Sequence, residues 1–208
     1  DYKGFENARL SSRLEGRIAD LEKSNNFLFA AAYKLNNEWS SLARLVQENR
    51  YTLTETGSNN QNIRVQLGLA YRPNRSDRLN VLAKYENRYE ITTPVGLVDS
   101  LATLNRSQIV SVHANVRPHV SLQLDGRIAA KWVRSHLDEL VTHNSAQLIY
   151  TRATYDLTDR IDLGAQLFLM HSSNGALQKG VGFEVGYLIS SDVWLSLGYN
   201  ALGFKEFD

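Results

Sequence analysis

Three side chains in the last quarter of the sequence have the types that acyl-transfer chemistry uses: His171, Ser173 and Glu184. A histidine can take the proton of a serine hydroxyl while a carboxylate orients the imidazole ring. Side chains alternate between the two faces of a strand, so His171 and Ser173 share the face of Leu169, whereas Glu184 lies opposite the face of its neighbour Phe183. This alternation argues against a catalytic group, and we expect no enzyme.

The remaining candidates for ligand chemistry have no suitable spacing. Four histidines are scattered without the i, i+2 or i, i+4 spacing of metal ligands: His113, His119, His136 and His143. Three glycines alternate within one apolar segment, with no helix after them that could bind phosphate: Gly180, Gly182 and Gly186. We expect these glycines to relieve crowding in a curved sheet, and we expect neither a metal nor a cofactor.

Alternation of apolar and polar residues runs along most of the chain and predicts strands with two unlike faces. One such segment carries Leu122, Leu124 and Gly126 on one face and Gln123 and Asp125 on the other. About eleven strands are predicted, near residues 8–19, 27–35, 38–50, 63–72, 79–91, 107–117, 122–134, 145–156, 160–170, 180–189 and 193–201. The predicted fold class is therefore all-β.

Length and composition limit the classes of protein that this chain can belong to. The 208 residues fit a single domain, which we predict to span residues 1–208. No run approaches the roughly 18 consecutive apolar residues of a membrane helix, but a barrel strand needs only about 10 residues of alternating character. The absence of cysteine removes disulfides and thiolate metal sites, and a net charge of +1 gives no field that would favour nucleic acid.

The predicted connections alternate in length. Short ones lie near 35–38, 72–78, 117–121, 156–160 and 189–192, and long polar ones near 51–62, 92–107, 135–144 and 171–179. Short turns at one end and long loops at the other are typical of an up-and-down transmembrane β-barrel whose long loops face the outside of the cell. Because such barrels close with an even number of strands, we expect about 12, with at least one closing strand beyond Asp208.

Two sets of side chains fit this barrel. An aromatic girdle at the periplasmic interface would be formed by Tyr33, Trp39, Tyr71, Tyr155, Tyr187 and Trp194. The lumen would be lined by the charged residues Arg13, Glu15, Arg17, Arg44, Lys84, Glu86, Arg88, Asp125, Arg127, Lys131, Arg152 and Glu184. Both signs of charge occur, so they can pair across the interior and fill it, although an open channel is also compatible with this composition.

Several segments resemble the C-terminal outer-membrane barrel region of large Gram-negative surface proteins, many of which carry repeat or OmpA-like regions. The matching segments are LGLAYRPNRSDRLNVLAKYE (67–86), IVSVHANVRP (109–118), GRIAAKWV (126–133), TYDLTDRIDLGA (154–165) and GFEVGYLISSDVWLSLGYNALGF (182–204). They occur in the same order as in that family, whose pattern continues past the final GF into one more strand. The resemblance implies location and architecture, and it brings no agreed catalytic residues.

A second, local resemblance concerns MHSSNGAL (170–177), which is similar to the H-x-S-N signature of outer-membrane lipid A deacylases. It would make His171 and Ser173 catalytic, with Glu184 as the orienting carboxylate. That fold is smaller, and this chain adds another hairpin after the motif. An irregular loop could change which way these side chains point, but we expect an extracellular turn in which Gly175 adopts a positive φ.

Together these features predict an integral protein of the Gram-negative outer membrane that anchors or assembles a surface or periplasmic structure. The alternatives are a small diffusion pore and, third, a lipid-modifying hydrolase that uses His171 and Ser173. The expected partners are outer-membrane lipid, lipopolysaccharide and other subunits or domains of an envelope assembly.

Overall fold

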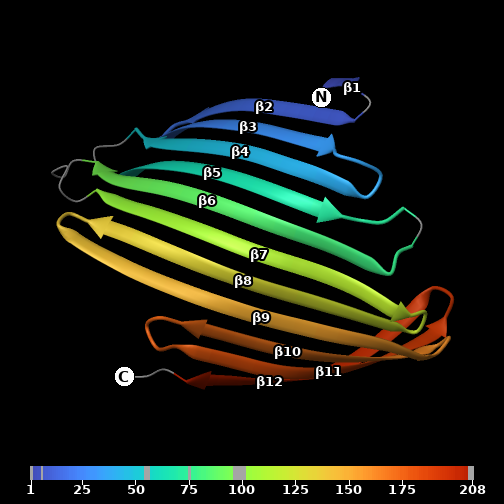
Figure 1. Cartoon of the computed structure of the whole chain (residues 1–208). Coiled ribbons are helices and arrows are strands. Elements are labelled where there is room, and N and C mark those ends of the chain that lie inside the picture. Colours follow the sequence, from blue (N-terminus) through green and yellow to red (C-terminus); the bar gives the residue numbers. More distant parts are fainter. Residues whose placement is uncertain (1, 6, 54–56, 75, 96–101, 206–208) are drawn as a thin grey trace. The chain divides into compact units, whose positions relative to one another are not determined.

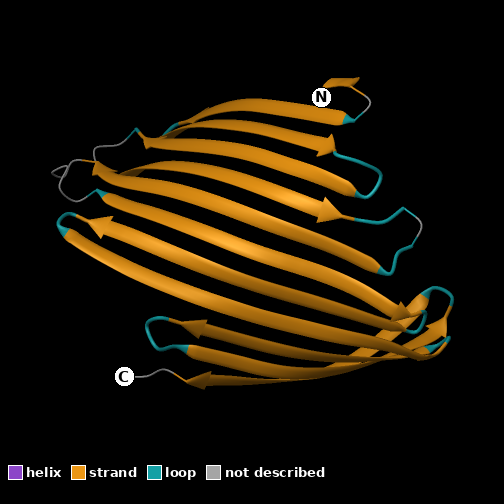
Figure 2. Ribbon diagram, in the orientation of Figure 1, coloured by secondary structure: helices purple, strands orange, loops and turns teal. Residues whose placement is uncertain are grey.

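All regular structure in the described part of the chain is β-strand (Figure 2). The computed structural model describes residues 2–5, 7–53, 57–74, 76–95 and 102–205, and these include no helix long and apolar enough to cross a bilayer. The strands are β1 (Tyr2–Phe5), β2 (Ala8–Ala19), β3 (Glu22–Lys34), β4 (Trp39–Thr52), β5 (Gly57–Tyr71), β6 (Leu79–Val95), β7 (Thr103–His119), β8 (Leu122–Leu137), β9 (Leu140–Thr158), β10 (Ile161–Ser172), β11 (Leu177–Ser190) and β12 (Val193–Lys205).

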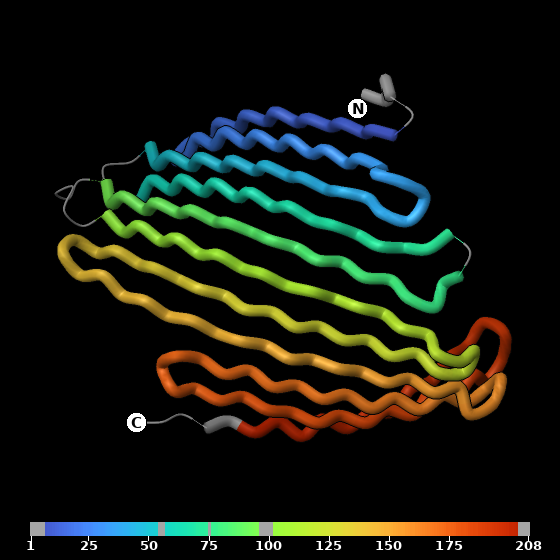
Figure 3. Tube along the Cα trace, viewed as in Figure 1, coloured from blue at the N-terminus to red at the C-terminus, as the bar shows by residue number. Residues whose placement is uncertain are grey.

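Each strand pairs with its neighbours in the sequence, so the sheet order runs from β1 to β12 without a crossover (Figures 1 and 3). The pairs β2–β3, β3–β4, β9–β10, β10–β11 and β11–β12 are antiparallel along nearly their whole length. Short connections force this arrangement, because a turn of a few residues can only join antiparallel neighbours. The predicted all-β, antiparallel up-and-down class is confirmed.

The eleven predicted strands correspond to β2 through β12. The twelfth strand is the four-residue β1, which pairs with β2 and precedes the first predicted strand. Its length is too short for an alternation pattern to show. The closing strand that we expect after Asp208 lies outside the described residues.

The prediction of long loops is wrong in the part of the chain that is described. The connection between β8 and β9 is the two-residue turn 138–139, and that between β10 and β11 is 173–176. Segments predicted as loop but found in strands are 51–52, 57–62, 92–95, 103–106, 135–137, 140–144, 171–172 and 177–179. Polar residues can extend a strand wherever the neighbouring strand satisfies their backbone groups, and an apolar pattern does not report this.

Backbone conformation at two turns agrees with these short connections. Gly175 has a φ of 89°, which confirms the positive value expected from the sequence, and Asp138 has a φ of 54°. Aspartate is among the few residues other than glycine that adopt this conformation at low cost. Tight reversals are therefore built at 138–139 and 173–176.

The chain divides into two compact units, each with one polar and one apolar face. Unit 1 comprises residues 1–70, 84–110 and 131–144, and unit 2 comprises residues 71–83, 111–130 and 145–208. In unit 1 the register aligns Glu15 with Asn26 on the polar face and Leu14 with Phe27 on the apolar face. The single domain predicted from chain length stays a prediction.

Register defines the two faces of unit 2 in the same way. Leu163 of β10 lies beside Val185 of β11, which lies beside Leu197 of β12, and these form the apolar face. One residue further along β10, Gly164 lies beside Glu184 on the polar face. Polar and apolar side chains are thus separated across the sheet.

Burial is inverted relative to a water-soluble protein. Among the described residues Val46 is the one buried hydrophobic side chain, while the buried polar residues are Glu86, Ser107 and Ser111. Exposed side chains on the apolar face include Leu14, Ile18, Phe29, Val65, Leu67, Leu69, Val110, Trp132, Leu163, Leu167, Leu169, Val181, Phe183, Val185, Leu197 and Tyr199. A chain of this length that folds in water buries its large apolar residues, so this face requires a different environment.

Candidate functional site

The polar face carries all twelve charged residues that the sequence assigns to a lumen. In unit 1 the register aligns Arg13 with Leu28, Arg17 with Ser24 and Arg44 with Ala30, all on this face. In unit 2 Asp125 accepts hydrogen bonds from Asn115 (2.6 Å) and Gln123 (3.1 Å), and alternation along β8 puts Arg127 and Lys131 on the same side. That this face lines a lumen is still a prediction.

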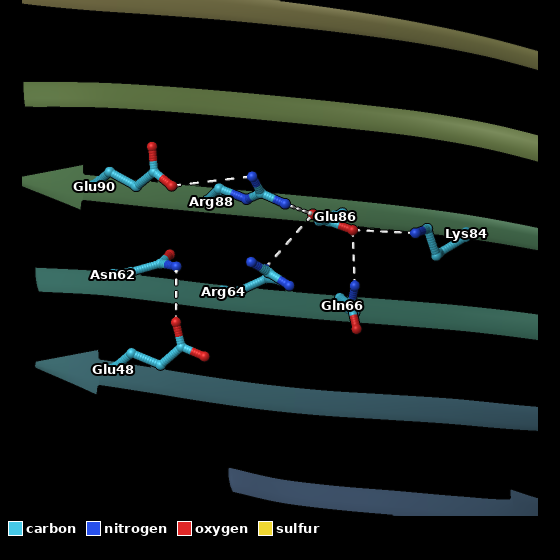
Figure 4. A network of polar contacts seen from close by, with 8 residues as sticks. All are labelled: Glu48, Asn62, Arg64, Gln66, Lys84, Glu86, Arg88 and Glu90. Carbon is cyan, nitrogen blue, oxygen red and sulfur yellow. Dashed lines mark hydrogen bonds and ion pairs between the residues drawn. The ribbon is translucent and has the colours of Figure 1, made fainter. Parts of the chain in front are cut away.

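The most buried charge of the polar face is Glu86 in β6, whose side chain is 5% exposed (Figure 4). Its Oε2 atom accepts hydrogen bonds from Gln66 Nε2 at 2.7 Å and Lys84 Nζ at 3.1 Å. Its Oε1 atom accepts one from an Arg88 guanidinium nitrogen at 3.1 Å, and Arg64 Nε lies 3.9 Å away. We call Glu86, Gln66, Lys84, Arg88 and Arg64 the Glu86 cluster.

Strand geometry explains this convergence. Lys84 and Arg88 lie two residues before and after Glu86 and therefore on the same face, while Gln66 and Arg64 come from the adjacent strand β5. Three cations surround one buried carboxylate, which satisfies both of its oxygens. The charged side chains of the Glu86 cluster therefore contact one another on the surface of the sheet.

Polar contacts continue beyond the cluster toward the end of the sheet that carries the turn 138–139. Asn62 of β5 donates to Glu48 of β4 at 3.3 Å, and Arg88 lies 4.0 Å from Glu90 (Figure 4). A recess of about 490 Å³ opens beside them, within unit 1. Its polar side chains are Ser24, Asn26, Glu48, Asn49, Arg50, Asn60, Gln61, Asn62, Glu90 and Thr92.

Sequence reasoning missed Gln66, Arg64 and Asn62 as members of this site. Arg64 and Gln66 occupy polar positions of a strand that alternation had already predicted, so the side on which they lie was predictable, whereas Asn62 lies in the segment predicted as loop. Which charge they contact depends on the pairing of β5 with β6, and a single strand's pattern does not contain that information.

In unit 2 the polar side chains bridge across glycines. Gln166 of β10 donates from Nε2 to Asn200 Oδ1 of β12 at 2.7 Å, across Gly182 of the intervening strand β11. The Tyr150 hydroxyl of β9 donates a hydrogen bond to Gln166 Oε1 at 3.2 Å. A Cβ atom at Gly182 would overlap both the Gln166 and the Asn200 side chains. The absent side chain is what lets this bridge span three strands.

A second bridge follows the same rule. Arg152 of β9 pairs with Glu184 of β11 at 2.8 Å, across Gly164 of β10. A Cβ atom at Gly164 would lie 3.3 Å from the Glu184 side chain and 3.7 Å from the Arg152 guanidinium group. The glycines of β10 and β11 therefore let long polar side chains lie flat on the sheet, in agreement with the sequence expectation that they relieve crowding.

Replacing Gly182 by alanine should break the Gln166–Asn200 bridge. The obstructing atoms belong to two flexible side chains, so the sheet should survive, and the cost should be that of one hydrogen bond, about 1 kcal/mol. The measurement is the free energy of urea unfolding in lipid vesicles. Gly126→Ala is the matched control, because nothing lies within 4 Å of a Cβ atom there. Equal stability of the two variants would argue against the bridge.

The candidate catalytic residues are not brought together. His171 lies beside Leu177 on the apolar face, whereas Glu184 lies on the polar face and is paired with Arg152. Ser173 is in the turn 173–176, where its Oγ accepts a hydrogen bond from the Ser145 backbone N–H at 2.8 Å. The described residues contain no group of three histidine, aspartate or glutamate side chains placed to hold a metal ion.

The aromatic residues assigned to a girdle divide between the two faces. Tyr33 and Trp39 share the apolar face at one end of β3 and β4, and Tyr155 and Tyr187 share it beside β10. Tyr71 ends β5 on the face of Leu67 and Leu69. Each of these five residues lies at or near a strand end, beside one of the connections 35–38, 72–78, 159–160 and 191–192.

Trp194 lies on the other face, contrary to the sequence expectation. It aligns with Leu188, and the register of β11 and β12 shifts between Leu188 and Ser190. A Cβ atom at Gly186 would overlap its ring and the Asp162 carboxylate, so the indole lies over the polar face. Alternation along β12 gives this orientation, because Trp194 lies on the side of Ser196 and Asn200, whereas Leu195 and Leu197 lie on the apolar side.

The site and fold thus define a class: a twelve-stranded antiparallel meander with one polar and one apolar exposed face. No protein-family model and no curated protein matches the chain in sequence. Among solved structures it is similar to the translocator domain of the autotransporter NalP from Neisseria meningitidis, at 12% identity and a TM-score of 0.39, covering 98% of this chain and 84% of that one.

Two further solved structures are similar at the same identity of 12%. One is the CymD monoaromatic hydrocarbon channel, with a TM-score of 0.45 and coverage of 95% of this chain and 82% of that one. The other is the β domain of the Bordetella autotransporter BrkA, with a TM-score of 0.36 and coverage of 95% and 91%. These similarities are distant in sequence and partial in geometry.

Proposed function

We propose that the chain forms the wall of a β-barrel in the outer membrane of a Gram-negative bacterium. The observation that carries this proposal is the inverted burial, with large apolar side chains exposed on one face and ions gathered on the other. Lipid would cover the apolar face, and closure of the sheet would pair every backbone group inside the membrane. The strands from β2 to β12 have 12 to 19 residues, more than the roughly 10 that span a bilayer.

Orientation follows from where this excess length lies. The first segments of β9 and β11, after the turns 138–139 and 173–176, include polar residues, while Tyr155 and Tyr187 of the apolar face lie near the other end of the same strands. Barrels of the outer membrane project further on the extracellular side than on the periplasmic side. We therefore propose that the turns 138–139 and 173–176 face outside the cell.

Within this setting we propose that the barrel anchors or assembles a surface or periplasmic structure, with other subunits or domains of the envelope as its partners. The Glu86 cluster and the two glycine-spanning bridges support this role, because the polar side chains contact each other along the wall. A closed, internally paired wall is sufficient for an anchor. The role requires no reactive group, consistent with the separation of His171 from Glu184.

A small diffusion pore is the second candidate. The polar recess of about 490 Å³ on the face that would line the lumen favours it, since this volume is in the range of small-ligand sites. Anchor and pore differ in what the lumen conducts.

Conductance of the refolded full chain in planar bilayers separates the two candidates. We expect insertion without large, steady currents, because the ions of the polar face are engaged with one another. A second measurement, swelling of proteoliposomes in neutral sugars, reports passage of solutes that carry no current. Large stable currents or rapid swelling would overturn the anchor in favour of the pore.

A further inference from the structure

A row of cationic side chains crosses the apolar face of unit 1. Arg106 is in β7, one residue from the buried Ser107 of the polar face, and shares its own side with the exposed Val110. Arg134 of β8 follows Trp132 on the same side, two residues further along the strand. Both arginines are exposed.

Strand pairing brings a third member into the row. The two-residue turn 138–139 puts Leu137 opposite Leu140, so Arg134 of β8 faces His143 of β9 on the same side. Asn115 of β7 donates to Asp125 of β8 at 2.6 Å, so these two residues lie side by side on the polar face. Arg106 is nine residues before Asn115 and Arg134 is nine residues after Asp125, so the two arginines lie at nearly the same height on the opposite, apolar face. We call the two cations Arg106 and Arg134, with the imidazole of His143 beside them, the cationic row.

The charge of this row is not balanced by the protein. Among the described residues, no carboxylate forms an ion pair with Arg106 or Arg134. Like charges on neighbouring strands repel, and an arginine beside lipid is stable only when its guanidinium group reaches a polar partner. A bound anion would reduce the repulsion between the arginines and would give each guanidinium group a polar partner.

We propose that the cationic row binds the phosphate groups of lipopolysaccharide in the outer leaflet. The inference rests on the proposed outer-membrane function. Arginine presents a planar fork of donors that matches phosphate, and two such forks at one height suit a lipid that carries more than one phosphate on its headgroup. The half-exposed Trp132 lies next to the row toward the apolar band, where an indole marks the boundary between hydrocarbon and headgroups.

Position along the strands also supports this choice of lipid. The row lies near the turn 138–139, at the end of the sheet that we propose to face outside. Lipopolysaccharide occupies that leaflet and carries more than one phosphate. Phosphatidylglycerol is also negatively charged, but it has one phosphate per headgroup. The two lipids therefore differ in how many arginines a single molecule can engage.

The test measures binding of purified lipopolysaccharide to the refolded full chain in micelles, with phosphatidylglycerol and dephosphorylated lipopolysaccharide as comparison lipids. The double variant Arg106→Gln/Arg134→Gln should weaken lipopolysaccharide binding on the order of tenfold or more. Arg117→Gln is the control, because Arg117 is an exposed arginine of β7 on the polar face at the other end of the strand. It should bind as the wild type does.

Preferential binding of phosphorylated lipopolysaccharide, lost in the double variant alone, is the expected result. Equal binding of phosphatidylglycerol, no effect of dephosphorylation, or unchanged binding by a double variant that still folds would each overturn the inference. Folding is monitored independently by the heat-dependent shift in gel mobility that barrels show. A wild-type chain that enters neither micelles nor vesicles would overturn the membrane proposal itself, whereas insertion without lipopolysaccharide preference overturns this inference only.

Discussion

Replacing Leu124 by arginine is expected to destabilise the chain in lipid by about 2 to 4 kcal/mol, if the residue faces the middle of the bilayer. Leu124 is 38% exposed on the apolar face of β8, so a charge there would have to leave water for hydrocarbon. The effect should appear as a lower urea concentration at the midpoint of unfolding in phospholipid vesicles.

The matched substitution is Gln123→Arg, one residue earlier in the same strand. Gln123 is on the polar face and donates to Asp125 at 3.1 Å, so an arginine there can pair with the same carboxylate. We expect a change within about 1 kcal/mol. Comparable losses at positions 123 and 124 would mean that the two faces of β8 are wrongly assigned, and with them the membrane orientation of the sheet.

Removing the charge of Glu86 is expected to be the most damaging change on the polar face. Glu86→Gln keeps the size of the side chain but leaves Lys84, Arg88 and Arg64 without their shared carboxylate. Breaking a buried ion pair from one side typically costs about 3 to 5 kcal/mol, and the partial exposure of the three cations should put the loss near the lower value. The measurement is again the free energy of urea unfolding in vesicles.

Two further variants test whether the loss at Glu86 comes from its burial and its charge. Glu184→Gln removes a carboxylate from a pair whose side chains are 38% and 39% exposed, and it should cost no more than about 1 kcal/mol. Adding Lys84→Gln to Glu86→Gln should recover part of the lost stability, because it reduces the repulsion among the remaining cations. A Glu86→Gln loss equal to that of Glu184→Gln would contradict the central place of Glu86.

Alternation along single strands was enough to predict much of this protein. The face on which Leu124 and Gln123 lie, the polar placement of Glu86 and Glu184, and the positive φ of Gly175 all follow from local chemistry. Strands that have one polar and one apolar face, separated by turn residues, are expected to form an antiparallel meander. A short turn can join two consecutive strands only in the antiparallel sense.

Loop lengths could not be predicted in the same way. Residues 140–144 have too little apolar character to be recognised as a strand, yet they extend β9. Their extension pairs with the end of β8 across the two-residue turn 138–139, which depends on the positive φ of Asp138, and an apolar alternation pattern does not report such a turn.

Sequence by itself thus determined the all-β class, the order of the predicted strands and which side chains of a strand share a face, but not where the strands end. The two-residue period of an extended backbone carries the shared face, and the short turns carry the order. Tertiary structure decided which residues contact one another: Glu86 with Gln66 and Arg64, and Gln166 with Asn200 across Gly182. These contacts depend on register, and register is set by hydrogen bonds between strands and by irregularities at their turns, which no single strand encodes.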